Sequence, residues 1–103
     1  MIIGVKIAFP TAQDKDTFIA DFTPVAEYVR QHEPTTISYE LLLSDKDDLH
    51  IYIMERYVSK QAYLEVHKKS SEFLSFREKF QKLIDSGTKV DGESYVESNI
   101  GFV

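Results

Sequence analysis

The sequence predicts an α+β fold of the ferredoxin-like type, in which helices cover one face of a four-stranded antiparallel sheet. Apolar residues alternate in four short segments, which is the pattern of half-buried strands. Between these segments apolar residues recur every three or four positions, as in amphipathic helices. The resulting order is β-α-β-β-α-α-β. It runs through residues 1–103 without a repeat or a linker, so we expect a single domain.

The first strand and the first helix are predicted at residues 2–9 and 14–32. The stretch IIGVKIAF alternates as a strand does, and PTAQD ends the pattern. The apolar positions of the helix are spaced by four, three and four residues: Phe18, Phe22, Val25 and Val29. Pro24 cannot donate a helical hydrogen bond. Either the helix kinks there, or Thr23 caps a second helical segment.

A hairpin follows, with strands at residues 36–44 and 49–57 joined by the polar turn DKDD. The second of these strands is apolar on both faces, because Tyr52 and Met54 alternate with the isoleucines around them. A sheet with one face in water carries polar residues on that face. We therefore expect the second face to pack against another copy of the chain in a homodimer. The alternative is a single-copy sheet with scattered exposed apolar residues.

Two helices are predicted next, over about residues 60–68 and then up to about residue 86, each preceded by serines that can cap it. The inner face of the longer helix carries Phe73, Phe76, Phe80 and Leu83. Residues 86–92 are predicted as a loop and residues 93–103 as the last strand. The final stretch NIGFV is apolar for a chain end, and we expect it to reach toward the partner subunit.

Composition excludes several classes of protein. The net charge is −5 and the pI is about 5.1, which argues against a nucleic-acid surface. There is no cysteine, so disulfides, thiolate metal sites and a cysteine nucleophile are excluded, and a cytoplasmic location is expected. No apolar run reaches the length of a membrane span, and the first residues are too interrupted for a signal peptide, so no membrane partner is expected.

Metal and phosphate chemistry are not predicted either. His32, His50 and His67 lack the spacing of metal ligands, and the chain has no glycine-rich phosphate loop. We therefore expect no metal site and no bound cofactor.

A set of residues from the end of the first helix to the last helix resembles the pattern of a known family. They are Glu33, Pro34, Tyr39, Glu55, Tyr57, Ala62, His67, Ser70 and Phe73. Together with the element order, they resemble the antibiotic biosynthesis monooxygenase domain. Two positions depart from the pattern. Thr35 stands where a glycine is expected, so the shape of that turn can differ. The tryptophan common after the strand glutamate is replaced by Tyr57, two positions on.

The resemblance implies a dimeric α+β barrel, in which two sheets face each other and each subunit has a pocket between its own sheet and helices. Family members described as monooxygenases oxidise phenols or quinols with O₂ and no bound metal or flavin. Other members degrade haem, using an axial histidine late in the second helical region and a nearby tryptophan. This chain has Arg77, Glu78 and Lys79 in that region and no tryptophan, so haem is not expected.

Glu55 and His67 are the candidate catalytic residues. Strand and helix periodicity point both side chains into the layer between sheet and helices, and we expect a hydrogen bond of about 3 Å between them. A carboxylate beside an imidazole raises the pKa of the histidine and fixes its tautomer. This suits an acid/base pair beside a phenol that must lose a proton, with His67 as the acid/base group and Glu55 as its orienting partner. The alternative is a pair that only ties the strand to the helix.

Aromatic side chains are the candidate substrate-binding residues. Tyrosine hydroxyls can orient a phenolic ligand, and phenylalanines can form a pocket wall. The candidates are Tyr39, Tyr52, Tyr57, Phe73 and Phe76. The alternative is that these side chains only pack the core or an interface.

Two functions remain open at this point. The first is a cofactor-independent monooxygenase that acts on a small phenolic or quinol compound. The second is a non-catalytic dimeric barrel that binds a small molecule or has a structural or stress-related role. An enclosed cavity reaching His67 favours the first, whereas side chains filling that space favour the second.

Overall fold

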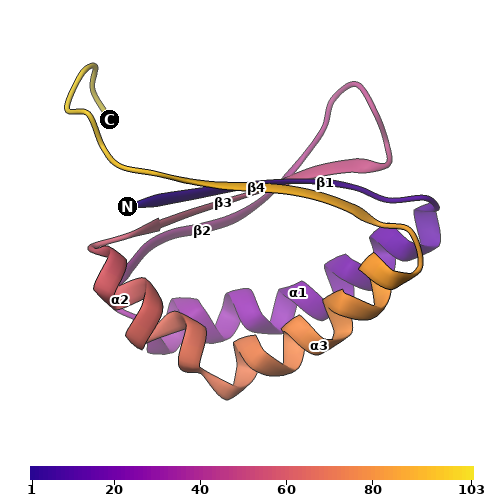
Figure 1. Cartoon of the computed structure of the whole chain (residues 1–103), viewed down its shortest axis with the longest axis horizontal. Coiled ribbons are helices and arrows are strands. Elements are labelled where there is room, and N and C mark those ends of the chain that lie inside the picture. Colours follow the sequence, from indigo (N-terminus) through magenta and orange to yellow (C-terminus); the bar gives the residue numbers. More distant parts are fainter.

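The computed structural model describes all 103 residues and contains the predicted four-stranded antiparallel sheet. The elements are β1 (Ile2–Ala8), α1 (Ala12–His32), β2 (Thr36–Leu43), β3 (His50–Tyr57), α2 (Lys60–Glu65), a 3₁₀ turn η1 (His67–Lys69), α3 (Ser71–Asp85) and β4 (Lys89–Tyr95). The strand order across the sheet is β2-β3-β1-β4. All three α-helices lie on one side of the sheet (Figure 1). The predicted ferredoxin-like order is therefore confirmed.

Helix α1 is one continuous helix, although Pro24 lies inside it. Thr11 caps its start by accepting a hydrogen bond from the amide of Asp14 at 3.1 Å. The hydroxyl of Thr23 donates to the carbonyl of Ile19 at 2.7 Å, so Thr23 is an interior residue and does not cap a second segment. The buried residues of the helix are the predicted ones: Phe18, Phe22, Val25 and Val29.

The shorter second helix ends earlier than predicted. Ser59 caps α2, and Ser70 caps α3 by accepting from the amide of Phe73 at 3.1 Å. Ser70 must be extended to act as that cap. Helix α2 therefore ends at Glu65, and a 3₁₀ turn that begins at His67 leads to Ser70, the cap of α3.

The alternation of side chains along each strand divides the strand residues between two faces. On β3 the residues that face the helices are all buried: Ile51, Ile53, Glu55 and Tyr57. The residues between them are half-buried or exposed. On β2, Tyr39 and Leu41 pack against the core, but a bulge between Thr36 and Ser38 leaves Ile37 exposed. We call the two sides of the sheet the inner face and the outer face.

The last strand lies earlier in the chain than predicted. β4 pairs with β1 from Lys89 to Tyr95, whereas the expected strand was 93–103. Its first residues resemble a loop because they contain aspartate and glycine, but an edge strand tolerates both when its neighbour supplies the hydrogen bonds. Beyond Tyr95 the pairing with β1 ends, because Ile2 is the last β1 residue in the ladder.

The core lies between the inner face and the helices. Aromatic rings form much of it, and Phe18 contacts the rings of Phe9, Phe22, Phe76 and Phe80 at centroid distances of 5.1–5.8 Å. None of the helices combines the length and the apolar run that a membrane crossing requires.

Candidate active site

A cavity of about 260 Å³ lies between the inner face of the sheet and the helices. Most of the side chains around it are apolar, including Phe73, Phe76 and Phe80 of α3. Its polar lining comes from four residues on four different elements: Tyr39 of β2, Glu55 of β3, Tyr63 of α2 and Arg77 of α3. The sequence pattern pointed to Tyr39 and Glu55 but not to Tyr63 or Arg77.

Glu55 is the carboxyl group that lines this cavity. The hydroxyl of Tyr57 donates to Glu55 Oε1 at 2.5 Å, which fixes the carboxylate from within the same strand. Burial raises the pKa of Glu55, and the nearby charge of Glu33 raises it further. The hydrogen bond from Tyr57 acts in the opposite direction, and the resulting pKa is about 7. Glu55 is thus poised to exchange a proton near neutral pH.

His67 lies deeper than Glu55 and does not line the cavity. The cavity therefore reaches Glu55, the expected orienting partner, but not His67, the expected acid/base group. Its side chain is 1% exposed, and its Nδ1 lies 2.9 Å from Glu33 Oε1. Its Nε2 lies 3.9 Å from Glu55 Oε1 and has no hydrogen-bond partner. Burial lowers the pKa of His67, and the hydrogen bond and charge of Glu33 act in the opposite direction.

The predicted hydrogen bond between Glu55 and His67 is therefore wrong, although both side chains point into the same layer. A distance of 3.9 Å is too long for one. His67 Nδ1 instead forms a hydrogen bond with Glu33, and the carboxylate of Glu55 accepts a hydrogen bond from the Tyr57 hydroxyl. His67 lies in the 3₁₀ turn after α2, and its ring is farther from the cavity than the Glu55 carboxylate.

Glu33 is the site residue that sequence reasoning missed as a partner of His67. It directly follows α1 and is 3% exposed. Its amide donates to the carbonyl of Val29, and its Oε1 accepts from the hydroxyl of Thr36 at 3.2 Å. A signal existed in the sequence. A carboxylate at the C-terminus of a helix is unfavourable unless another group compensates its charge.

The aromatic candidates fall into three groups. Tyr39, Phe73 and Phe76 line the cavity, as the sequence suggested. Tyr57 is buried and does not line it, but it holds Glu55. Tyr52 is on the outer face and does not line this cavity. The single-residue alternation of β3 sends it to the opposite side of the sheet from Glu55.

The rings around His67 make its surroundings apolar. The ring centroids of Tyr39, Tyr57 and Phe73 lie 4.7–5.4 Å from that of His67. Burial raises the pKa values of the Tyr39 and Tyr57 hydroxyls, and the charge of Glu55 adds to this. Both tyrosines therefore stay neutral near neutral pH, and the Tyr57 hydroxyl acts as the donor to Glu55.

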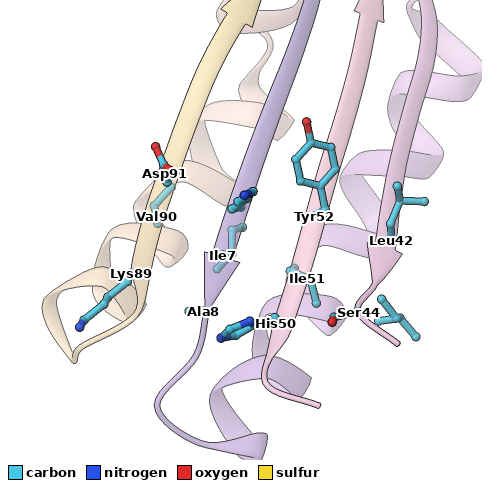
Figure 2. Close-up of a pocket in the computed structure, with 12 residues that line it drawn as sticks. Ile7, Ala8, Leu42, Ser44, His50, Ile51, Tyr52, Lys89, Val90 and Asp91 are labelled. Atoms are coloured by element: carbon cyan, nitrogen blue, oxygen red, sulfur yellow. The ribbon is translucent and has the colours of Figure 1, made fainter. Parts of the chain in front are cut away.

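The outer face carries a separate, open hollow of about 460 Å³. Figure 2 shows this hollow with the helices behind the sheet, and with Tyr52 and Leu42 standing beside each other. The ring of Tyr52 lies across Gly4, where a Cβ atom would overlap its hydroxyl. Lys6, His50 and Asp91 supply charged or polar groups around the hollow.

Solved structures with the same fold include several small proteins. A proposed antibiotic biosynthesis monooxygenase from Caulobacter crescentus is 21% identical, with a TM-score of 0.72 over 93% of this chain and 90% of that one. A conserved protein of unknown function from Bacteroides thetaiotaomicron, described as a possible oxidoreductase, is 16% identical, with a TM-score of 0.75 over 89% and 90%. A second proposed monooxygenase, from Deinococcus radiodurans, is 16% identical, with a TM-score of 0.73 over 100% and 99%.

At these identities the likeness to solved structures shows the fold alone. No curated protein matches the chain in sequence. The sequence does match the model of a family described as antibiotic biosynthesis monooxygenase, over residues 1–87. This match covers most of the chain, from β1 to the end of α3. The protein therefore belongs to the antibiotic biosynthesis monooxygenase family.

Proposed function

We propose that the protein is a cofactor-independent monooxygenase that binds a small phenolic or quinol compound in the inner cavity. The observation that carries this proposal is a carboxyl group with a pKa of about 7 that lines an otherwise largely apolar cavity. General bases act best when their pKa is close to the working pH. A phenol bound beside Glu55 would lose its proton to that carboxylate.

The cavity suits a small aromatic ligand. An apolar protein cavity of about 150 Å³ is large enough for benzene, and this one is about 260 Å³. Phenylalanine rings provide the apolar contact, while Tyr39 and Tyr63 offer hydroxyl groups at the wall. Arg77 is exposed on α3 and supplies a positive charge at the same cavity, which favours an anionic phenolate.

The overall reaction balances without a further reductant. When a phenol becomes a quinone, one oxygen atom of O₂ replaces a ring C–H hydrogen and becomes the second carbonyl oxygen. The other oxygen atom leaves as water. The substrate supplies all four electrons that O₂ accepts. In this scheme the protein binds the phenol, and Glu55 takes its hydroxyl proton, which makes the ring a better electron donor.

Oxygen uptake across a panel of phenols and hydroquinones tests the proposal. With an accepted substrate, Glu55→Gln should lower turnover by about 10²-fold or more, the usual size of a general-base contribution. The glutamine keeps an oxygen that accepts from Tyr57. The matched control is Glu78→Gln, an exposed glutamate on α3, which should keep full activity. Full turnover by folded Glu55→Gln protein would exclude Glu55 as the base. Binding of the panel compounds without oxygen uptake would favour the non-catalytic alternative.

We also propose that the chain forms a homodimer through the outer face. That face carries Leu42, Tyr52 and Met54, and no element of the same chain covers it (Figure 1). The C-terminal segment lies on the same side of the sheet, away from the helices (Figure 1). Its residues Ile100, Phe102 and Val103 are almost fully exposed. A second copy would cover both the hollow and this segment.

A further inference from the structure

Three titratable side chains form a row between the α1–β2 connection and the inner cavity. Glu33 Oε1 lies 2.9 Å from His67 Nδ1, and His67 Nε2 lies 3.9 Å from Glu55 Oε1. Only Glu55 of the three lines the cavity. The proposed reaction uses Glu55 and leaves the two deeper groups without a role, although burying them is costly.

The hydrogen bond to Glu33 fixes the tautomer of His67. A carboxylate accepts hydrogen bonds and donates none, so Nδ1 carries the hydrogen of the neutral imidazole. The lone pair is then on Nε2, and this atom is buried without a hydrogen-bond partner. It is the histidine nitrogen nearer to Glu55, and a movement of about 1 Å would bring it to hydrogen-bond distance. The empty acceptor therefore lies next to the group that would take a proton from the substrate.

The other groups that pack around His67 do not supply a positive charge. Tyr39 comes from β2, Tyr57 from β3 and Tyr63 from α2, and burial raises the pKa of each hydroxyl, so all three are neutral. Phe73 of α3 closes the fourth side. Two cations lie near Tyr63. Lys68 Nζ is 5.6 Å from the centroid of the Tyr63 ring, and the charge of Arg77 opposes the rise that burial causes in the Tyr63 pKa.

We propose that Glu33 is a positioning residue that makes His67 the second proton acceptor of the site. The proton of the bound phenol passes to the Glu55 carboxylate and then from Glu55 to His67 Nε2. The transfer is uphill, because the pKa of Glu55 is about 7 and that of His67 is below its ordinary value. Ionised Glu55 and an imidazolium between two carboxylates therefore form as a minor population, and its size depends on the pKa of His67. Glu33 orients the ring before the transfer and stabilises the positive charge after it. This inference rests on the proposed function, since it takes Glu55 as the first acceptor.

The first test uses the unmodified chain and needs no substrate. In ¹⁵N-labelled protein, the His67 resonances should show a protonated Nδ1 and an unprotonated Nε2. They should also show a pKa below the ordinary histidine value, because burial outweighs the charge of Glu33. The exposed His32 and His50 serve as internal references in the same spectrum. A His67 ring protonated on Nε2 alone would overturn the proposal, whether or not the protein has activity.

The second test is Glu33→Gln, which keeps an oxygen that can accept from Nδ1 but removes the negative charge. The tautomer should stay the same, while the pKa of His67 falls further because the imidazolium has lost its stabilising charge. Turnover should fall about tenfold for each pKa unit lost, with little change in KM. A purely structural role would lower the melting temperature and shift the His67 titration but leave kcat unchanged, and an unchanged kcat would overturn the proposal.

The two proposals fail in different ways. A changed His67 titration in Glu33→Gln, in a protein that oxidises none of the panel compounds, would support the Glu33–His67 arrangement and count against the monooxygenase. If Glu33→Gln does not fold, Glu33→Asp serves instead, since it keeps the negative charge but shortens the side chain and moves the carboxylate away from His67 Nδ1. The pKa of His67 and kcat should both fall in this variant, because the charge then lies farther from the imidazolium. An unchanged His67 titration and kcat in folded Glu33→Asp protein would overturn the role of Glu33.

Discussion

The two faces of the sheet differ in a way that reverses the simplest expectation for a soluble protein. The inner face is covered by helices, yet it buries Glu55 and lies next to the equally buried Glu33 and His67. The outer face is uncovered, yet it carries Leu42 and Tyr52. Hydrophobic residues are usually buried and charged ones exposed. The charged groups inside are the basis of the proposed chemistry, and the apolar groups outside are the basis of the proposed dimer.

Strand β3 produces both faces from one run of eight residues. Its inward residues change from isoleucine to Glu55 and Tyr57 along the strand, so the apolar core and the polar site are adjacent on the same face. A fold that needed only a core would be at least as stable with apolar residues in place of a buried charge pair. Variants on the two faces test this contrast.

The largest effect is expected at His67. His67→Ala leaves the carboxylate of Glu33 buried without its hydrogen-bond donor and leaves a cavity where the ring was, so the free energy of unfolding should fall by about 3–5 kcal/mol. The matched change is His50→Ala, which removes an exposed histidine at the outer face and should stay within about 0.5 kcal/mol. Urea denaturation of both variants measures the difference. Equal losses in the two variants would mean that the contact between His67 and Glu33 does not contribute to stability.

The next effect is the dependence of stability on pH. Glu55 has a pKa of about 7 in the folded protein and 4.5 as its ordinary value. Between these values the folded state holds a proton that the unfolded state has released. The free energy of unfolding should therefore fall by about 3 kcal/mol as pH rises through this range.

The lowered pKa of His67 acts with the opposite sign below its ordinary value of 6.5, because there the unfolded state binds more protons. Comparing the wild type with Glu55→Gln isolates the glutamate. Measured by urea denaturation from pH 4.5 to 8, the stability difference, wild type minus variant, should fall by about 3 kcal/mol. A constant difference over this range would show that Glu55 titrates at its ordinary pKa.

A smaller effect is expected for assembly through the outer face. Leu42→Lys places a charge in the proposed interface and should weaken the dimer by about 2–3 kcal/mol, roughly 10²-fold in its dissociation constant. Leu74→Lys is the matched control on the helical side, where the leucine is similarly exposed, at 47% against 42% for Leu42. Sedimentation equilibrium compares the two. A wild-type protein that is monomeric at micromolar concentration would contradict the proposed dimer.

The smallest effect is expected at two glycines on opposite faces. Gly4→Ala should displace the ring of Tyr52 on the outer face and cost about 1 kcal/mol. At Gly92, which lines the inner cavity, an added Cβ would make only an ordinary contact with Val5 at 3.6 Å. Gly92→Ala should leave the melting temperature nearly unchanged. A larger loss at Gly92 than at Gly4 would contradict the packing described here.

Local patterns in the sequence were enough to predict the element order and the face on which most strand residues lie. Alternation placed Ile51, Ile53 and Glu55 on one side of β3 and Tyr52 on the other. The phenylalanine spacing likewise identified the buried side of α3. These features follow from backbone geometry that repeats every two or 3.6 residues, so neighbouring residues are enough to reveal them.

The hydrogen bonds that connect the site could not be predicted from these patterns, because they depend on how distant segments pack. Glu33 and His67 are 34 residues apart and meet only because the end of α1 and the 3₁₀ turn lie together in the fold. The position of β4 depends in the same way on its pairing with β1. A hydrogen bond forms or fails over less than 1 Å, and sequence periodicity places side chains no more finely than a face. The pattern could therefore bring Glu55 and His67 into one layer, but the choice of Glu33 as the bonded partner depended on the packing of the whole chain.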